Sequence, residues 1–307
     1  MKYFKKYTMA LPVIVVAVLA GCSTTHKLES SAEQIIRWQQ IANQDQLQIR
    51  LRWSKPMIPG PHPTIVVHPG LDDDEQQIDT VADDLVNEGY LVVVVNYQRK
   101  IRNTYQKTLL PLRENSDFTA ALEIIRKNPL VDQSRIGALG FSIGGAHSFL
   151  MAAKSSHVKA IATYYPMADF MRWAAEKEES FIGRMIIRFV RWNFNAEAEH
   201  HNDSYHLNLL QRYSPVNHTG SIAAPVLIVH GDKDNIAPLD HSKELHQLLL
   251  NNTQIEARIM IVDNAPHAFG FDYSDRAMQS WLLTKSWLQH NLSRKKLAKN
   301  EADLSGV

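Results

Sequence analysis

A serine in a glycine-rich turn is the first residue of this sequence that could do chemistry. Ser142 lies in the segment GFSIG (140–144), which matches the pattern G-x-S-x-G. The apolar run 135–141 predicts a strand before this serine, and residues 146–154 predict a helix after it. Glycines leave room where a strand turns sharply into a helix, so that the hydroxyl stands at the carboxyl end of the strand. This context favours a nucleophile over an incidental serine in an ordinary glycine-rich turn.

A serine hydroxyl is a weak nucleophile unless a base takes its proton and an acid orients that base. The acid candidates are Asp232 and Asp234, which follow the apolar run 225–231. Asp232 comes directly after the glycine that ends this predicted strand and is expected to shape the loop, so Asp234 is preferred. The base candidate is His267, the one histidine in the loop between the last predicted strand and the closing helix. We expect His267 to bond to Asp234 through Nδ1 and to take the Ser142 proton at Nε2.

Acyl transfer also needs hydrogen-bond donors for the oxyanion that forms at the attacked carbonyl. One expected donor is the backbone N–H of Ile143, the residue after the nucleophile. The second is expected from the loop that follows the apolar run 64–70. Pro69 has no N–H, and Leu71 is therefore the preferred residue in that loop.

The other histidines that stand out are not expected to be catalytic. His68 is interpreted as loop packing, and His147 as a residue that points into packing or solvent. His200 and His201 are adjacent and would face different ways, which makes them a poor pair of metal ligands. The sequence contains no H-E-x-x-H motif and no clustered carboxylates of metal-site spacing, so we expect neither a metal nor a cofactor.

Segments typical of strands and helices alternate along the chain from residue 47. Apolar runs predict strands at 64–70, 90–97, 135–141, 158–166, 225–231 and 255–262, and helical patterns cover 77–89, 118–129, 146–154 and 276–292. Residues 47–53 alternate apolar and polar side chains, as in a half-buried edge strand. The continuous run at 90–97 is typical of a strand that is buried on both faces of a parallel sheet. The pattern predicts an α/β fold whose mostly parallel central sheet is flanked by helices.

The segment 167–213 does not follow the alternation and is expected to form a helical cap insertion of one or two helices. Trp173 and Trp192 could line a pocket there, although apolar faces of helices more commonly pack into a core. The expected organisation is a leader at 1–21, a tether and short helix at 22–46, the main domain at 47–291 and a charged tail at 292–307.

The N-terminal residues resemble the signal peptide of a bacterial lipoprotein. Three lysines precede an apolar run at 9–20, which is short for a bilayer span of about 20 residues. The run ends in the sequence LAGC, whose Cys22 is the only cysteine of the chain. The resemblance implies that residues 1–21 are removed and that Cys22 carries the lipid. Ser23 after the cysteine implies sorting to the outer membrane, facing the periplasm.

The composition excludes several classes of protein. The chain has 307 residues, of which 45% are hydrophobic, and it carries 33 Lys and Arg against 32 Asp and Glu. This balance excludes a disordered polyelectrolyte and argues against a nucleic-acid binder. A single cysteine excludes a disulfide framework. The oligomeric state leaves no trace in the sequence.

Three segments together resemble the α/β-hydrolase superfamily. They are GFSIGG (140–145), HGDKDNIAP (230–238) and PHAF (266–269). Within the superfamily, the chain is most similar to dienelactone hydrolase-like proteins and to the catalytic domain of the prolyl oligopeptidase family, over about residues 47–291. The resemblance implies an α/β-hydrolase fold, with Ser142 as nucleophile, Asp234 as acid and His267 as base. It departs from dienelactone hydrolases in its serine, where they commonly have cysteine, and in its long insertion.

The expected function is hydrolysis of a carboxylic ester through an acyl-enzyme on Ser142. The expected substrate is a small-molecule ester or a peptide. The alternatives are a peptidase or amidase of the prolyl oligopeptidase type, an acyltransferase that uses an alcohol in place of water, and a non-catalytic envelope binding protein. An intact set of serine, acid and histidine argues against the last of these, because binding alone does not require all three.

Overall fold

A computed structural model describes residues 37–42, 47–71, 73, 75–101, 104–107, 116–179, 184, 208, 210–252 and 255–294. The chain divides into two units, residues 1–31 and 32–307, and every described residue belongs to the second. The predicted leader, Cys22, Trp192, His200 and His201 therefore lie outside the described residues. None of the described helices is long and apolar enough to cross a bilayer.

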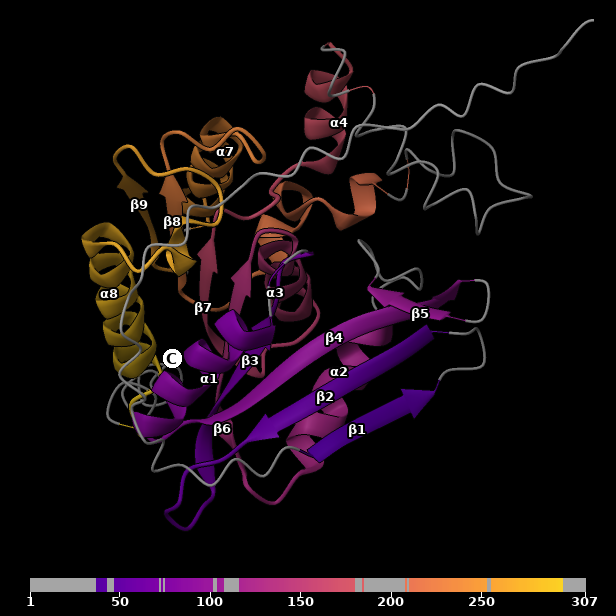
Figure 1. Cartoon of the computed structure of the whole chain (residues 1–307), viewed down its shortest axis with the longest axis vertical. Coiled ribbons are helices and arrows are strands. Elements are labelled where there is room, and N and C mark those ends of the chain that lie inside the picture. The colour runs from indigo at the N-terminus through magenta and orange to yellow at the C-terminus, as the bar shows by residue number, and fades with distance from the viewer. Residues whose placement is uncertain are drawn as a thin grey trace, which may run out of the picture. The chain divides into compact units, whose positions relative to one another are not determined.

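A sheet of nine described strands forms the centre of the second unit (Figure 1). Its order is β1-β2-β4-β3-β6-β7-β8-β9, with β5 paired to β4. The strands are β1 Arg37–Ala42, β2 Leu47–Ser54, β3 His62–His68, β4 Leu91–Ile101, β5 Thr104–Lys107, β6 Val131–Phe141, β7 Val158–Tyr164, β8 Val226–Gly231 and β9 Ala257–Val262. Neighbours from β4 to β9 pair in parallel, whereas β1, β2 and β5 pair antiparallel. The predicted mostly parallel sheet is thus confirmed.

Helices cover both faces of this sheet (Figure 1). One face carries α1 (Glu75–Asn87) and α8 (Asp275–Asn291), and the other carries α2 (Ser116–Lys127), α3 (Ile143–Ala153) and α7 (Leu239–Leu250). Successive side chains of a strand point to opposite faces. Val92 and Val94 of β4 therefore pack toward α1 and α8, and Val93 and Val95 pack toward α2 and α3. This is why β4 reads as an unbroken apolar run.

The short helix predicted within residues 22–46 is wrong where the structure describes this region. Residues 37–42 form β1, which pairs antiparallel with β2 from Arg37 opposite Trp53 to Ala42 opposite Gln48. A short helix gains little stability by itself, whereas a strand at a sheet edge satisfies its backbone groups through the neighbouring ladder. The prediction that 47–53 is an edge strand is also wrong, because β1 covers the outer side of β2.

Further described elements that were not predicted are β5, α7 and two short 3-10 helices, η1 (Pro215–Ser221) and η2 (Phe269–Phe271). Within the predicted insertion, the structure describes α4 (Phe170–Glu178), whose first turn is capped by Asp169 through a hydrogen bond from the Arg172 N–H at 3.0 Å. Most of residues 180–207 lie outside the described part of the chain. Helix α4 is thus one of the one or two helices predicted for this insertion.

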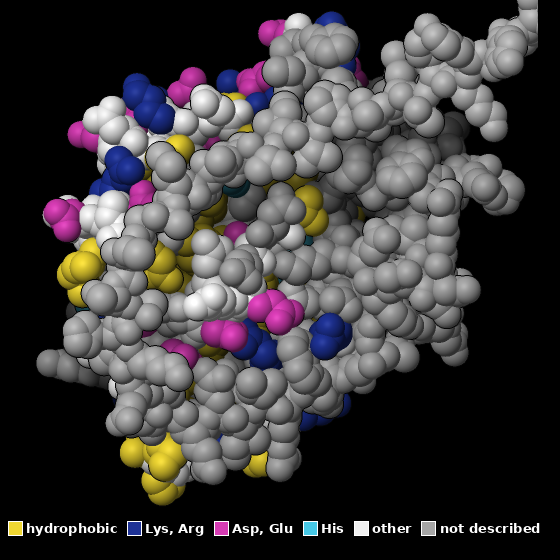
Figure 2. All heavy atoms as spheres, viewed as in Figure 1, with side chains coloured by type: hydrophobic (Ala, Val, Ile, Leu, Met, Phe, Trp, Pro, Cys, Tyr) yellow, Lys and Arg dark blue, Asp and Glu magenta, His cyan; other side chains and the backbone are white. Residues whose placement is uncertain are grey.

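Charged side chains of both signs are interspersed over the described part of the face in Figure 2. Neither sign forms a continuous area among the described side chains in this view. This distribution agrees with the near-equal totals of 33 basic and 32 acidic residues. A phosphate backbone is typically bound by a concentrated basic surface, and the described side chains of this face offer none.

Candidate active site

Ser142 occupies the sharp turn between β6 and α3. Its φ of 53° and ψ of −121° lie in a region that costs free energy for a residue with a side chain. Backbone hydrogen bonds hold this conformation. The Ser142 N–H donates to the Tyr164 carbonyl at 2.9 Å, and the Ser142 carbonyl accepts from the N–H groups of Gly145 at 2.9 Å and Met167 at 3.2 Å. The strained turn is therefore fixed from both sides.

Two glycines of the GFSIG segment are required by close backbone contacts. A Cβ atom on Gly140 would lie 2.2 Å from the Gly144 carbonyl oxygen. A Cβ atom on Gly144 would lie 2.0 Å from the carbonyl oxygen of His68, at the end of β3. The first turn of α3 thus lies directly against the chain that leaves β3. This contact brings the loop after β3 next to the nucleophile.

Replacing Gly144 with alanine is expected to lower the free energy of unfolding by about 2 kcal/mol or more. The new methyl group would strike the His68 carbonyl, and neither the α3 backbone nor the β3 backbone can shift without disturbing its own hydrogen bonds. Thermal unfolding of the purified variant measures the effect. Gly220→Ala is the matched control, because a Cβ atom there meets nothing within 4 Å. Equal melting temperatures for the two variants would contradict the close packing described for Gly144.

The structure brings Ser142, His267 and Asp234 together. His267 Nε2 lies 3.0 Å from Ser142 Oγ, and His267 Nδ1 lies 2.7 Å from Asp234 Oδ2. The three residues follow β6, β9 and β8, whose carboxyl ends meet at one edge of the parallel sheet. Because a carboxylate only accepts, Nδ1 carries the imidazole proton and leaves the Nε2 lone pair for the serine O–H. Among the described residues, the side-chain hydrogen bonds of His267 go to Asp234 and Ser142, whereas Asp232 Oδ2 lies 3.7 Å from the Lys233 ammonium.

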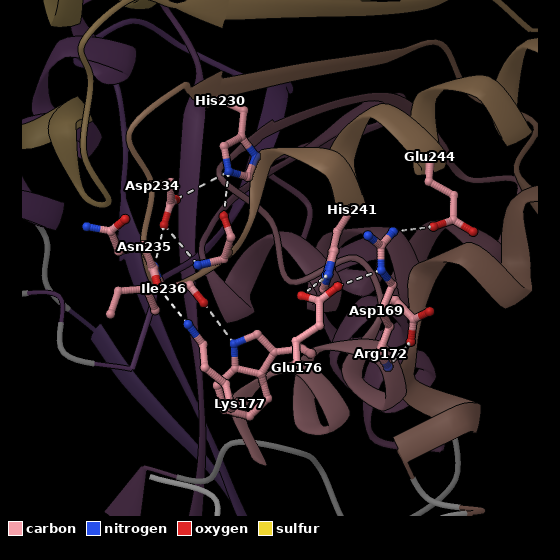
Figure 3. A network of polar contacts seen from close by, with 12 residues as sticks. Asp169, Arg172, Glu176, Lys177, His230, Asp234, Asn235, Ile236, His241 and Glu244 are labelled. Atoms are coloured by element: carbon pink, nitrogen blue, oxygen red, sulfur yellow. Dashed lines mark hydrogen bonds and ion pairs between the residues drawn. The ribbon is translucent and has the colours of Figure 1, made fainter. Parts of the chain in front are cut away.

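The side chain of Asp234 is fully buried and surrounded by donors (Figure 3). Its Oδ1 accepts from the N–H groups of Ile236 and Ala237, both at 2.8 Å, and its Oδ2 lies 3.3 Å from His230 Nε2. Burial by itself would raise the pKa of Asp234. The hydrogen bonds from His230 and His267, the electrostatic attraction of His267 and the Ala237 N–H together hold this pKa well below its usual range. Asp234 therefore remains a carboxylate.

His230 is a neighbour of Asp234 that the sequence reasoning missed. It is fully buried in β8, with Nε2 2.8 Å from the Ala237 carbonyl and 3.3 Å from Asp234 Oδ2. Both of these partners are acceptors, so Nε2 carries the proton and Nδ1 accepts from Ser242 Oγ at 2.8 Å. Its position two residues before Asp232 was the available signal, but a histidine inside an apolar strand is indistinguishable in sequence from a core residue.

Tyr165 is a neighbour of His267 that the sequence did not reveal. Its ring centroid lies 4.7 Å from that of His267, and its backbone has a φ of 40°. Its hydroxyl is buried without a hydrogen-bond partner among the described residues. Burial, with the nearby charge of Asp73, raises the pKa of Tyr165 well above its usual value. The phenol therefore stays neutral and packs beside the imidazole.

The two predicted oxyanion donors lie in the segments that surround the nucleophile. Ile143 is the first residue of α3, where a backbone N–H has no acceptor within the helix. Leu71 is half-buried in the loop after β3. The Gly70 N–H donates to Asp73 Oδ2 at 2.6 Å and thereby shapes this loop immediately before Leu71.

His68 and His147 are buried packing residues, as the sequence suggested, but His68 is the last residue of β3 and not a loop residue. His68 is fully buried, and its Nδ1 lies 2.9 Å from Ser148 Oγ. The His147 ring lies 5.3 Å from the ring of Tyr97 and 5.6 Å from that of Phe118. Burial and the neighbouring His147 hold the pKa of His68 well below its usual value, so its imidazole is neutral.

Comparison with known proteins agrees with this architecture. A Bradyrhizobium sp. protein described as "Probable 2-oxo-3-(5-oxofuran-2-ylidene)propanoate lactonase" is 22% identical over 261 residues, which cover 79% of this chain and 90% of that protein. "Uncharacterized peptidase YuxL" of Bacillus subtilis is 23% identical over 189 residues, which cover 60% of this chain and 27% of that protein. The structure of Pyrococcus horikoshii acylaminoacyl peptidase superposes with a TM-score of 0.65 at 22% identity, over 86% of this chain and 44% of that one.

The chain thus spans about a quarter of the length of the Bacillus relative and less than half of the Pyrococcus structure. At this identity, the structural likeness establishes the α/β-hydrolase fold. A profile of the Dienelactone hydrolase family matches residues 50–292, which is most of the chain. This match covers the turn of Ser142 and the loops of Asp234 and His267. The chain is therefore a member of the dienelactone hydrolase family, and so of a family of hydrolases.

Proposed function

We propose that this chain is a serine hydrolase that cleaves carboxylic esters by acyl transfer to Ser142. The observation that carries the proposal is the continuous line of hydrogen bonds from Asp234 to His267 at 2.7 Å and from His267 to Ser142 at 3.0 Å. Membership of a hydrolase family supports it. A non-catalytic envelope protein has no need of such an aligned serine, imidazole and carboxylate.

In the proposed reaction, the Ser142 oxygen attacks the ester carbonyl carbon while His267 Nε2 accepts the hydroxyl proton. The imidazolium that forms is stabilised by the buried Asp234 carboxylate. The tetrahedral intermediate collapses when its C–O bond breaks, and His267 returns the proton to the leaving alkoxide. Water then attacks the acyl carbon while His267 accepts its proton, the bond from this carbon to Ser142 Oγ breaks, and His267 gives the proton to Oγ, which releases the acid and restores the serine.

The oxyanion of each tetrahedral intermediate needs donors on the side away from His267. We assign this role to the backbone N–H groups of Ile143 and Leu71. The position of Ile143 at the N-terminus of α3 supports the first assignment, because the helix dipole there favours negative charge. The contact of the His68 carbonyl with the first turn of α3 supports the second, because it brings the loop of Leu71 toward the serine.

Peptide or amide hydrolysis is the second candidate. It is favoured by the names of two similar proteins, the Bacillus peptidase and the Pyrococcus acylaminoacyl peptidase. The same serine chemistry cleaves both bonds, and the difference lies in the leaving group that His267 must protonate. An acyltransferase would form the same acyl-enzyme, and an alcohol would attack it in the second step in place of water.

One set of assays separates these activities. The purified protein is incubated with p-nitrophenyl esters of increasing acyl length, with acylated aminoacyl anilides and with a fluorophosphonate probe. We expect covalent labelling and ester turnover. Turnover of the anilides with little ester turnover would identify a peptidase, and products that appear only with added alcohol would identify an acyltransferase. A folded protein that the probe does not label would contradict a serine hydrolase.

We further infer from the sequence that the mature chain is anchored in the bacterial cell envelope by lipid on Cys22. The apolar run 9–20 and the LAGC sequence that ends at this cysteine support the inference. One acyl chain binds a membrane only marginally, whereas several hold a protein stably. The active site would then face the periplasm from the outer membrane.

Replacing Cys22 with serine is expected to abolish incorporation of labelled palmitate in the bacterial host, because serine lacks the sulfur to which the lipid is attached. The precursor should also keep residues 1–21. Ser142→Ala is the matched control, since it leaves the N-terminal residues unchanged and should incorporate the label normally. Palmitate incorporation that persists in Cys22→Ser would overturn the inference.

A further inference from the structure

Two side chains of α4 bind the loop that contains Asp234 (Figure 3). Trp173 Nε1 donates to the Ile236 carbonyl at 2.8 Å, and Lys177 Nζ donates to the Asn235 carbonyl at 2.6 Å. The two residues are four positions apart, so they lie on the same face of the helix. The carbonyls that they bind belong to the two residues that follow Asp234.

The same two peptide units also bind the Asp234 carboxylate. A trans peptide is planar, and its C=O and N–H groups point in opposite directions. The Asn235 carbonyl shares a peptide with the Ile236 N–H, and the Ile236 carbonyl shares the next one with the Ala237 N–H. Both of these N–H groups donate to Asp234 Oδ1 at 2.8 Å. Each peptide is thus held by α4 at its oxygen and by Asp234 at its nitrogen, and each donor to the oxygen strengthens the bond at the nitrogen.

Helix α4 is itself fixed to α7, the helix that follows the Asp234 loop. Arg172 Nη1 donates to Glu244 Oε2 at 2.9 Å. Glu176 Oε2 lies 2.9 Å from Nε2 of His241, which is almost fully buried (Figure 3). Exposed ion pairs contribute little stability individually, but here they define where α4 lies relative to the loop.

The residues that lead into α4 are hydrogen-bonded to the turn of Ser142. The Met167 N–H donates to the Ser142 carbonyl at 3.2 Å, and the Phe170 N–H donates to Oγ of the buried Ser214 at 2.9 Å. The path from residue 167 through α4 therefore begins at the proposed nucleophile and ends on the loop of the proposed acid.

We propose that Trp173 and Lys177 are positioning residues that orient the Asp234 carboxylate through the peptides 235–236 and 236–237. This inference rests on the proposed function of Asp234. Helix α4, the first helix of the insertion, would then help to align Asp234 with His267 and Ser142, in addition to any role in covering the substrate. Neither side chain is placed against the reacting atoms.

The experiment compares two double variants of the full-length protein. Trp173→Phe with Lys177→Met removes both donors while it keeps an aromatic ring and a long side chain. The matched control is Trp281→Phe with Lys285→Met on α8, where the same residue types at the same spacing bind the carboxylates of Asp84 in α1 and of Glu88, the residue after α1. Both pairs are half-buried. The control therefore removes equivalent bonds away from the Asp234 loop.

The measurements are kcat, KM and the low-field proton resonance of His267 Nδ1–H, assigned by its absence in His267→Ala. We expect the α4 variant to lose about 10-fold to 100-fold in kcat with KM little changed, because a small misplacement of a catalytic group is costly. Its resonance should shift and broaden. The α8 control should keep both the wild-type kcat and the wild-type resonance. Lys177→Arg, which keeps a donor, should restore most of the activity that Lys177→Met loses.

Equal kcat values and equal resonances in the two double variants would overturn the proposal. If the α4 double variant does not fold, the single variants and Lys177→Arg decide the same question by the same two measurements. If the wild-type protein turns over no acyl substrate, the proposed function fails. The His267 resonance still tests the positioning in that case, because it depends only on the bond to Asp234.

Discussion

Replacing Ser142 with alanine is expected to lower kcat by about a million-fold, because the acyl-enzyme can no longer form. The fold should be preserved. The Ser142 hydroxyl is hydrogen-bonded to His267 and makes no capping bond to α3, and alanine can keep the same backbone bonds. Steady-state hydrolysis of the best ester from the panel measures the loss, and fluorophosphonate labelling should disappear with it.

Ser286→Ala is the control for this variant, because Ser286 is an exposed serine of α8. It should retain wild-type turnover and labelling. Circular dichroism and thermal unfolding of Ser142→Ala should match the wild type, which separates loss of chemistry from loss of fold. Substantial turnover by a folded Ser142→Ala protein would rule out the proposed nucleophile.

Replacing Asp234 with asparagine is expected to lower kcat by about ten-thousand-fold. The N–H groups of Ile236 and Ala237 donate to one oxygen of the carboxylate, and the amide oxygen of asparagine would take that place. The amide NH₂ would then face His267 Nδ1 and force the proton onto Nε2. An imidazole in that tautomer cannot accept the Ser142 proton.

Asp232→Asn is the matched control, because it makes the same chemical change two residues earlier in the same loop. Its carboxylate lies 3.7 Å from the Lys233 ammonium and makes neither of the hydrogen bonds described for His267, so the kcat of this variant should change less than about 3-fold. Both variants are assayed with the same ester across a range of pH. If Asp232→Asn inactivates the protein and Asp234→Asn does not, the assignment of the acid is wrong.

Asp234 should also make the stability of the protein depend on pH. Its pKa is depressed in the folded chain, so the unfolded chain binds a proton at a pH where the folded chain does not. The stabilisation is present above the ordinary aspartate pKa of about 3.9 and is lost as the pH falls below it. The free energy of unfolding, measured with urea, should therefore differ less between the wild type and Asp234→Asn below about pH 4 than above it.

Local patterns were sufficient to predict the parallel strands and the turn that holds Ser142. The valines of β4 are apolar on both faces because both faces are covered, and that requirement is visible in a single run of residues. Gly140 and Gly144 are likewise visible in sequence, because only glycine fits where their Cβ atoms would strike the backbone. In both cases the residues that meet the constraint stand close together in the sequence, although the Gly144 contact itself is with the distant His68 carbonyl.

The N-terminal segment shows where such patterns fail. Residues 37–42 lie in the segment where a short helix was predicted, but they form β1 because the edge of β2 offers backbone partners. Helix α7 escaped prediction because its sequence follows the loop of Asp234 without a capping side chain, its N-cap position being Pro238. The first outcome depends on the strand that lies beside the segment, and the second on a helix whose start lacks the usual capping residue.

The sequence by itself determined the fold class, the turn of Ser142 and the short set of candidate residues, because each is encoded by neighbouring positions. Only the tertiary structure decided which side chains meet. His267 bonds to residues 125 and 33 positions away, and the second of these is Asp234 and not Asp232. The contacts of Trp173 and Lys177 with the Asp234 loop were hidden for the same reason, since they arise from packing between elements and leave no periodic signal in the chain.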